Sequence, residues 1–193
     1  LESSNSEEVI EKVEFGTYHA LIIGNNDYRN LPDLKTAVFD AEEVEEILRD
    51  QFNFNTTLIK NGKREEILKA LNDLRFRLTD NDNLLIYYAG HGYLDEKINQ
   101  GYWQPVDAQE VRKSNWISNS DIEDAIKGID AKHILLVSDS CFSGSLSRGF
   151  ITKDEADDDE SWLKFIRETP ARRVLTSGSL EPVADGGKDG HSI

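Results

Sequence analysis

The stretch LLVSDSCFSG, residues 135–144, ends a short apolar run abruptly at polar residues and at Cys141, the single cysteine of the chain. Such a run is typical of a buried strand in a parallel sheet. The small residues that follow it predict a turn. Ligands of open parallel sheets bind beyond the carboxyl ends of the strands. The stretch therefore predicts a thiol at the edge of a sheet where chemistry can take place.

A second stretch, LLIYYAGHG at residues 84–92, has the same organisation and ends in His91 between two glycines. If the two strands are neighbours, His91 and Cys141 face each other at one edge. An imidazole can take the proton of a thiol, whose free pKa is about 8.5, or stabilise the thiolate. The backbone N–H groups of Gly92 and Cys141 would then point at a developing oxyanion.

A lone cysteine is more often a small core residue than a nucleophile. The matched strand-end contexts of Cys141 and His91 favour the catalytic interpretation. His19 and His133 lie at the starts of predicted strands, at the opposite edge, and His191 lies in a glycine-rich tail. We interpret these three as structural or solvated.

Apolar periodicity predicts strands and helices that alternate along the chain. This alternation is typical of βαβ crossovers and predicts an α/β fold, with a mostly parallel sheet covered by helices on both faces. A short strand or hairpin is expected within residues 93–117, and Ser120 with Glu123 fits a capping box. The predicted strands are 18–23, 56–60, the run before His91, 134–138 and 173–177, and the predicted helices are 34–52, 67–78 and 120–129.

The sequence indicates one domain with four parts. They are an N-terminal arm (1–17), a large catalytic part (18–146), an acidic flexible linker (147–160) and an apparently incomplete small part (161–193).

Composition excludes several classes of function. The formal net charge of −15 over 193 residues argues against nucleic-acid partners and favours basic substrates. No apolar run reaches the roughly 20 residues that span a membrane. A single cysteine forms no internal disulfide, which suits a reducing cytoplasmic setting, and no zinc-ligand spacing is present.

The motifs YYAGHG (87–92) and DSCFSG (139–144) resemble the two catalytic motifs of caspase-like cysteine peptidases. The spacing of about 50 residues between His91 and Cys141 equals the caspase spacing. The chain is more similar to the paracaspase, orthocaspase and metacaspase branch than to animal caspases, because it has Asp-Ser-Cys where those have Gln-Ala-Cys. The resemblance covers about residues 18–182.

The resemblance implies a three-layer caspase-like fold and peptide-bond hydrolysis. It makes Cys141 the nucleophile, His91 the general base and acid, and the N–H groups of Gly92 and Cys141 the oxyanion hole. No third member of the catalytic set can be assigned from the motifs. Two other functions remain open: a catalytically silent caspase-like module that binds partners, and a cysteine-dependent transpeptidase.

Three acidic residues match positions that form a specificity pocket in the paracaspase-like branch. Asp139 lies within the nucleophile motif, Asp40 lies near the start of the first predicted helix, and Glu181 is a weaker match after the last strand. Such a pocket would select Arg or Lys before the scissile bond. The alternative for Asp40 is a residue that stabilises the helix dipole.

The acidic linker allows two interpretations. Family members are often cleaved between the two parts of the domain, and Arg148, Lys153 and Arg167 would suit self-cleavage or an activating protease. Alternatively the run Asp157–Asp159 would bind calcium, as some metacaspases require. That run lacks the ligand spacing of a calcium site, so we expect a solvated segment and no cofactor.

Family members continue beyond the last strand predicted here. The edge of that strand would otherwise be exposed. We therefore expect a second chain or a missing C-terminal segment to complete the sheet.

Overall fold

The structure, a computed structural model, describes residues 16–140 and 170–176. The elements in chain order are β1 (Thr17–Gly24), α1 (Ala37–Phe52), β2 (Asn55–Lys60), α2 (Arg64–Arg77), β3 (Asp82–Ala89), β4 (Gly92–Asp95), β5 (Gln100–Trp103), η1 (Lys113–Asn115), β6 (Ile117–Ser118), α3 (Asn119–Lys127), β7 (His133–Asp139) and β8 (Ala171–Thr176).

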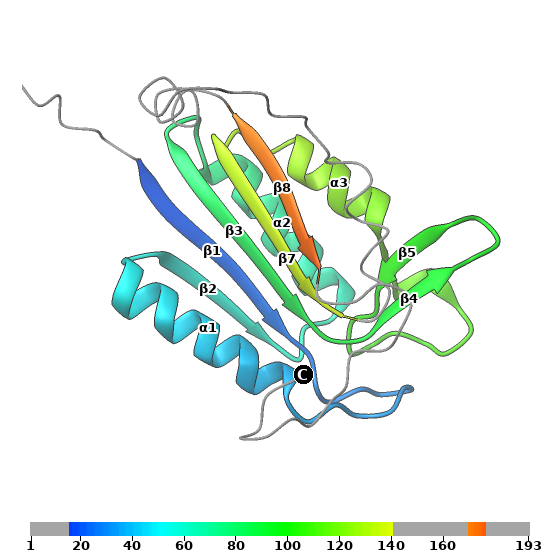
Figure 1. Cartoon of the computed structure of the whole chain (residues 1–193). Helices are drawn as coiled ribbons and strands as arrows, with labels where there is room; N and C mark the ends of the chain where they lie inside the picture. Colours follow the sequence, from blue (N-terminus) through cyan, green and yellow to red (C-terminus); the bar gives the residue numbers. More distant parts are fainter. Residues whose placement is uncertain (1–15, 141–169, 177–193) are drawn as a thin grey trace, which may run out of the picture.

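Five strands form a parallel sheet in the order β2-β1-β3-β7-β8 (Figure 1). Helix α1 packs on one face of the sheet, and α2 and α3 pack on the other. The predicted fold class, a mostly parallel sheet with helices on both faces, is confirmed. Strands β3 and β7, which precede His91 and Cys141, are neighbours, which meets the condition for His91 and Cys141 to face each other.

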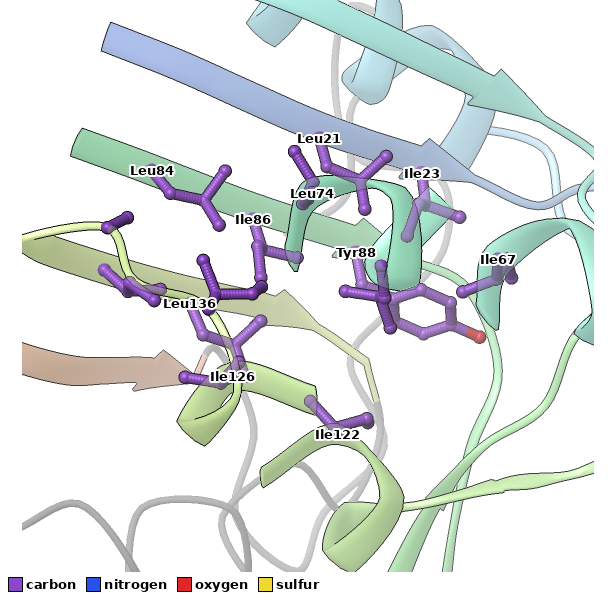
Figure 2. Close-up of a cluster of buried hydrophobic side chains, with 14 of the residues drawn as sticks. Leu21, Ile23, Ile67, Leu74, Leu84, Ile86, Tyr88, Ile122, Ile126 and Leu136 are labelled. Atoms are coloured by element: carbon purple, nitrogen blue, oxygen red, sulfur yellow. The ribbon is translucent and has the colours of Figure 1, made fainter. Parts of the chain in front are cut away.

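Strand β3 shows why its sequence is a continuous apolar run. Leu84, Ile86 and Tyr88 belong to the core formed with α2 and α3, whereas Tyr87 and Ala89 belong to the core beneath α1. Figure 2 shows side chains of the first group meeting the leucines and isoleucines of the two helices. Because successive side chains point to opposite faces, a strand covered on both faces must be apolar at every position.

Helix α1 begins close against the carboxyl end of β1. A Cβ atom added to Gly24 would lie 2.6 Å from the Ala37 carbonyl oxygen and 2.7 Å from the Cβ atom of Ala41. Only glycine fits at so close an approach. This contact brings the first turn of α1, including Asp40, to the carboxyl edge of the sheet.

Helix α1 starts at Ala37 and not at the predicted residue 34. The N–H of Leu34 donates to the Asn26 carbonyl (3.0 Å), which holds residue 34 in the loop before the helix.

The predicted hairpin within 93–117 is formed by antiparallel strands β4 and β5, to which β6 adds. The predicted capping box of Ser120 and Glu123 is wrong. Ser118 caps α3 instead: its Oγ accepts from the Asp121 N–H (3.1 Å), and the Asp121 carboxylate accepts from the Ser118 N–H (3.1 Å).

Two predicted boundaries are wrong, one at the start of β1 and one at the start of β8. Thr17, assigned to the arm, is the first residue of β1, and β8 begins at Ala171, two residues before the predicted strand. The linker at 147–160 lies outside the described residues, as does most of the segment 161–193. In the described ranges, no helix has the length and apolar character needed to cross a membrane.

Candidate active site

The carboxyl ends of β1, β3 and β7 come together at one edge of the sheet (Figure 1). Backbone hydrogen bonds tie the segments that leave these strands to one another. The Asn25 N–H donates to the Ala89 carbonyl (3.0 Å), and the Gly90 N–H donates to the Asp139 carbonyl (3.4 Å). The chain that follows β1 is therefore held against the end of β3, and the chain that follows β3 is held against the end of β7.

The strand register matches the two sequence motifs. Ala89, the last residue of β3, pairs with Asp139, the last residue of β7. His91 and Cys141 each follow two residues after these partners. The first described range ends at Ser140, so Cys141 itself lies outside the described residues.

The His91 imidazole is half-buried and is held from two sides. Its Nε2 lies 2.8 Å from the Pro32 carbonyl oxygen. Because a carbonyl can only accept, Nε2 carries the proton, and Nδ1 of the neutral ring is the basic nitrogen. The ring of Tyr28 packs against the imidazole, with centroids 4.6 Å apart at an angle of 53°. The two motifs indicate no such partner, because a backbone carbonyl leaves no signal in a sequence.

The backbone of His91 is held as well, by two tyrosines that the sequence analysis did not single out. The His91 N–H donates to the Tyr28 hydroxyl (2.8 Å), and the Tyr88 hydroxyl donates to the His91 carbonyl (2.8 Å).

Gly92, the predicted oxyanion donor, is the first residue of β4 and pairs with Trp103 of β5. The Gln104 N–H donates to the His91 carbonyl (2.9 Å), which marks the Gly92–Trp103 pair as one without direct hydrogen bonds. The pairing with β5 therefore does not use the Gly92 N–H.

Two of the three carboxylates predicted to form the specificity pocket, Asp139 and Asp40, raise the pKa of the Tyr87 phenol. Burial is the main cause that raises the pKa of Tyr87, and the negative charges of Asp139 and Asp40 raise it further. Asp40 lies in the first turn of α1 with 8% of its surface exposed, and Asp139 ends β7. Acidic side chains from α1 and β7 thus both act on Tyr87. Glu181 lies outside the described residues.

A buried polar network lies on the opposite face of β7. Ser138 and Ser140 have their Oγ atoms 3.0 Å apart, and the indole N–H of Trp103 donates to Ser138 (3.2 Å). Trp103 stacks on Tyr88 with ring centroids 4.2 Å apart. The sequence signal for this network is the alternation of Ser, Asp and Ser before Cys141, because it places both serines on the core side of the strand.

The histidines interpreted as structural lie near the starts of their strands. His19 Nε2 is 3.3 Å from Asp82, and His133 Nδ1 is 2.7 Å from the Asn83 side-chain oxygen. Both contacts join neighbouring strands far from His91. His191 lies outside the described residues.

In the ranges 16–140 and 170–176, no group of three or more His, Cys, Asp or Glu side chains is arranged to hold a metal ion. The acidic run Asp157–Asp159, the alternative calcium ligand set, lies outside these ranges. That the protein needs no cofactor stays a prediction.

Comparisons with known proteins agree with the resemblance seen in the motifs. A family model described as Caspase domain matches residues 17–187. The human Mucosa-associated lymphoid tissue lymphoma translocation protein 1 is 35% identical over 95 residues, and its mouse homolog is 34% identical over the same length. Each match covers 49% of this chain and 11% of the relative.

A solved structure shares the fold. The crystal structure of a protein from Geobacter sulfurreducens superposes with a TM-score of 0.56 and covers 66% of this chain and 51% of that chain. With 20% sequence identity, this likeness concerns the fold alone.

Proposed function

The chain belongs to the caspase-domain family of peptidases, and from this premise we propose that it is a cysteine endopeptidase that cleaves peptide bonds after Arg or Lys. The register of β3 against β7 carries the proposal. Ala89 pairs with Asp139, so the segments that lead to His91 and to Cys141 begin at matching positions of the two strands. Neighbouring parallel strands lie roughly 4.8 Å apart, which suits proton transfer between side chains that follow them.

In the proposed reaction, the Cys141 thiol gives its proton to Nδ1 of His91, and the sulfur attacks the carbonyl carbon of the peptide bond. The imidazolium returns the proton to the leaving amine as the C–N bond breaks. Water then hydrolyses the thioester, with His91 again as the base. The hydrogen bond from Nε2 to the Pro32 carbonyl supports this scheme, because it presents Nδ1 as the base and stabilises the imidazolium.

The proposed oxyanion hole consists of the N–H groups of Gly92 and Cys141. The Gly92 N–H suits this role because the antiparallel pairing of β4 with β5 leaves it unused. A donor fixed by a strand backbone needs no reorganisation when negative charge develops on the carbonyl oxygen.

Specificity for basic residues is proposed from the two carboxylates beside Tyr87. Asp40 and Asp139 approach from different elements and both affect the pKa of this phenol. A guanidinium or ammonium group between them would gain charge-assisted hydrogen bonds. Glu181 remains a predicted third member.

The remaining sequence predictions become part of the proposal. An enzyme with this specificity, or an activating protease, would cut the linker at Arg148 or Lys153. Its partners are protein substrates with Arg or Lys before the cut, together with a segment or second chain that completes the sheet. A chain with one cysteine suits the cytoplasm.

A panel of fluorogenic peptides that differ in the residue before the cut tests the proposal. We expect kcat/KM to be highest for Arg and Lys and lowest for Asp. We also expect Cys141→Ala and His91→Ala to lower kcat by about 10³-fold or more while the circular dichroism spectrum is retained. Preferential cleavage after Asp, or full activity without Cys141, would contradict the proposal.

A further inference from the structure

We propose that Tyr28 and Tyr88 are positioning residues that hold His91 for proton transfer, an inference that rests on the proposed peptidase function. Their hydroxyls lie on opposite sides of the His91 main chain, one 2.8 Å from its nitrogen and one 2.8 Å from its carbonyl oxygen. Both residues are buried, with 8% of Tyr28 and none of Tyr88 exposed. Neither belongs to the pocket or to the reacting groups.

The two hydroxyls also hydrogen-bond to each other, which closes a ring. The directions of the two bonds to His91 follow from the partners, because a backbone N–H only donates and a backbone carbonyl only accepts. Tyr28 accepts from the His91 N–H, and the Tyr88 hydroxyl lies within donating distance of both the His91 carbonyl and the Gln104 carbonyl (3.2 Å). The contact between the two hydroxyls joins the bonds to His91 into one buried network, and the bonds of such networks strengthen one another.

The loop between β1 and α1, which carries Tyr28 and Pro32, also holds the imidazole. The Tyr28 ring packs against the imidazole in a tilted arrangement, and the Pro32 carbonyl accepts from Nε2. The loop itself is anchored, because the Tyr28 N–H donates to the Asp33 carboxylate (2.8 Å) and the Arg29 N–H donates to the Val106 carbonyl (3.0 Å). Tyr28 therefore links the backbone of His91 to the orientation of its side chain.

The glycine before His91 makes room for the ring of hydrogen bonds. A Cβ atom on Gly90 would lie 2.8 Å from the Tyr28 hydroxyl and 2.9 Å from the Tyr88 hydroxyl. Burial raises the pKa of both phenols, so both remain protonated over the range in which an imidazole titrates. The ring of hydrogen bonds therefore persists in both charge states of His91.

Kinetics of Tyr28→Phe and Tyr88→Phe in the whole chain test the inference, with Tyr18→Phe as the matched control. Tyr18 packs on Phe54 (centroids 5.2 Å apart), on β1 rather than in the loop that contacts His91. We expect kcat to fall about 10-fold to 100-fold in the two variants, with KM nearly unchanged and a shifted pH profile of kcat/KM. Unchanged kcat and pH profile in Tyr28→Phe would overturn the inference. Tyr28→Phe carries the test if Tyr88→Phe, whose ring stacks in the core, does not fold.

Nitrogen NMR of the imidazoles gives a readout that needs no activity. The chain has four histidines, so His91→Ala assigns the His91 signals. We expect a proton on Nε2 in the wild type and a mixture of tautomers in Tyr28→Phe. A changed tautomer in a chain that cleaves no peptide would support the positioning role and contradict the proposed function. An unchanged tautomer would overturn the positioning role even if the wild type is an active peptidase.

Discussion

At the scale of single residues, the proposed specificity pocket draws Asp139 and Asp40 from distant parts of the chain. Asp139 ends β7, whereas Asp40 belongs to the first turn of α1 and reaches the same edge because Gly24 lets that helix approach β1. Both charges raise the pKa of Tyr87, whose side chain belongs to the core beneath α1. The helix-dipole interpretation of Asp40 is compatible with this position, because a first-turn carboxylate also faces the positive end of the helix.

Replacing one carboxylate tests the pocket. For Asp139→Asn we expect kcat/KM for an Arg substrate to fall about 10-fold to 100-fold, because a hydrogen bond to a charged group contributes about 1.5–3 kcal/mol. Glu46→Gln is the control, since it removes the same charge from an exposed position of α1. An equal effect of the two substitutions on the peptide panel would contradict a specific role for Asp139.

Asp82, the first residue of β3, lies at the edge of the sheet opposite His91. It offers a test of how a carboxylate stabilises the fold. Desolvation by burial raises its pKa, but hydrogen bonds from Thr79 and the contact with His19 outweigh that effect and lower the pKa overall. A lowered folded-state pKa stabilises the fold above the unfolded-state pKa of about 3.9, and the stabilisation is lost as the pH falls through the folded-state value. We expect Asp82→Asn to cost about 1 kcal/mol of unfolding free energy at pH 7 and less below pH of about 4. Urea unfolding at several pH values measures this, and a pH-independent cost would contradict the explanation.

At the scale of elements, the start of α3 shows where local sequence rules fail. Both Ser118 with Asp121 and Ser120 with Glu123 fit the capping pattern, so the sequence alone cannot choose between them. The pairing of Ser118 with Tyr102 of β5 decides it, because β6 fixes residue 118 as extended chain directly before the helix.

This start of α3 can be tested by a pair of substitutions. Ser118→Ala should lower the free energy of unfolding by about 1 kcal/mol, because it removes the acceptor of the Asp121 N–H. Ser120→Ala should have a smaller effect, because it removes only an exposed hydrogen bond to the Gln100 side chain (3.2 Å). Thermal or urea unfolding of both variants measures the difference, and the reverse order of effects would contradict the assigned cap.

Predictions from the sequence succeeded where one element's own pattern carries the information. The apolar runs before His91 and Cys141 indicated buried strands, as found for β3, both faces of which are covered by helices. That the two strands are neighbours comes from the structure alone. The Pro32 carbonyl and the Tyr28 hydroxyl could not be predicted, because they reach His91 through a loop whose path depends on tertiary contacts. The positions of Cys141 and Glu181 stay predictions, since both lie outside the described residues.

At the scale of the whole molecule, the sheet has an apolar area at its β7–β8 end. Leu135 has 37% and Leu175 has 60% of its surface exposed among the described residues. A recess of about 380 Å³ lies nearby, lined by Tyr18, Phe54 and Leu85 among others. The expectation that further polypeptide completes this part of the sheet remains a prediction.

Covalent labelling tests the central claim, a Cys141 nucleophile activated by His91 and selective for basic residues. Peptidyl chloromethyl ketones ending in Arg or Asp would be incubated with the wild type, His91→Ala and Cys141→Ala, and adducts would be followed by intact-protein mass spectrometry. Because the chain has one cysteine, loss of the adduct in Cys141→Ala identifies the site. We expect one adduct with the Arg reagent, much slower labelling with the Asp reagent, and a large loss of rate in His91→Ala. Equal rates in wild type and His91→Ala, or faster labelling by the Asp reagent, would contradict the claim.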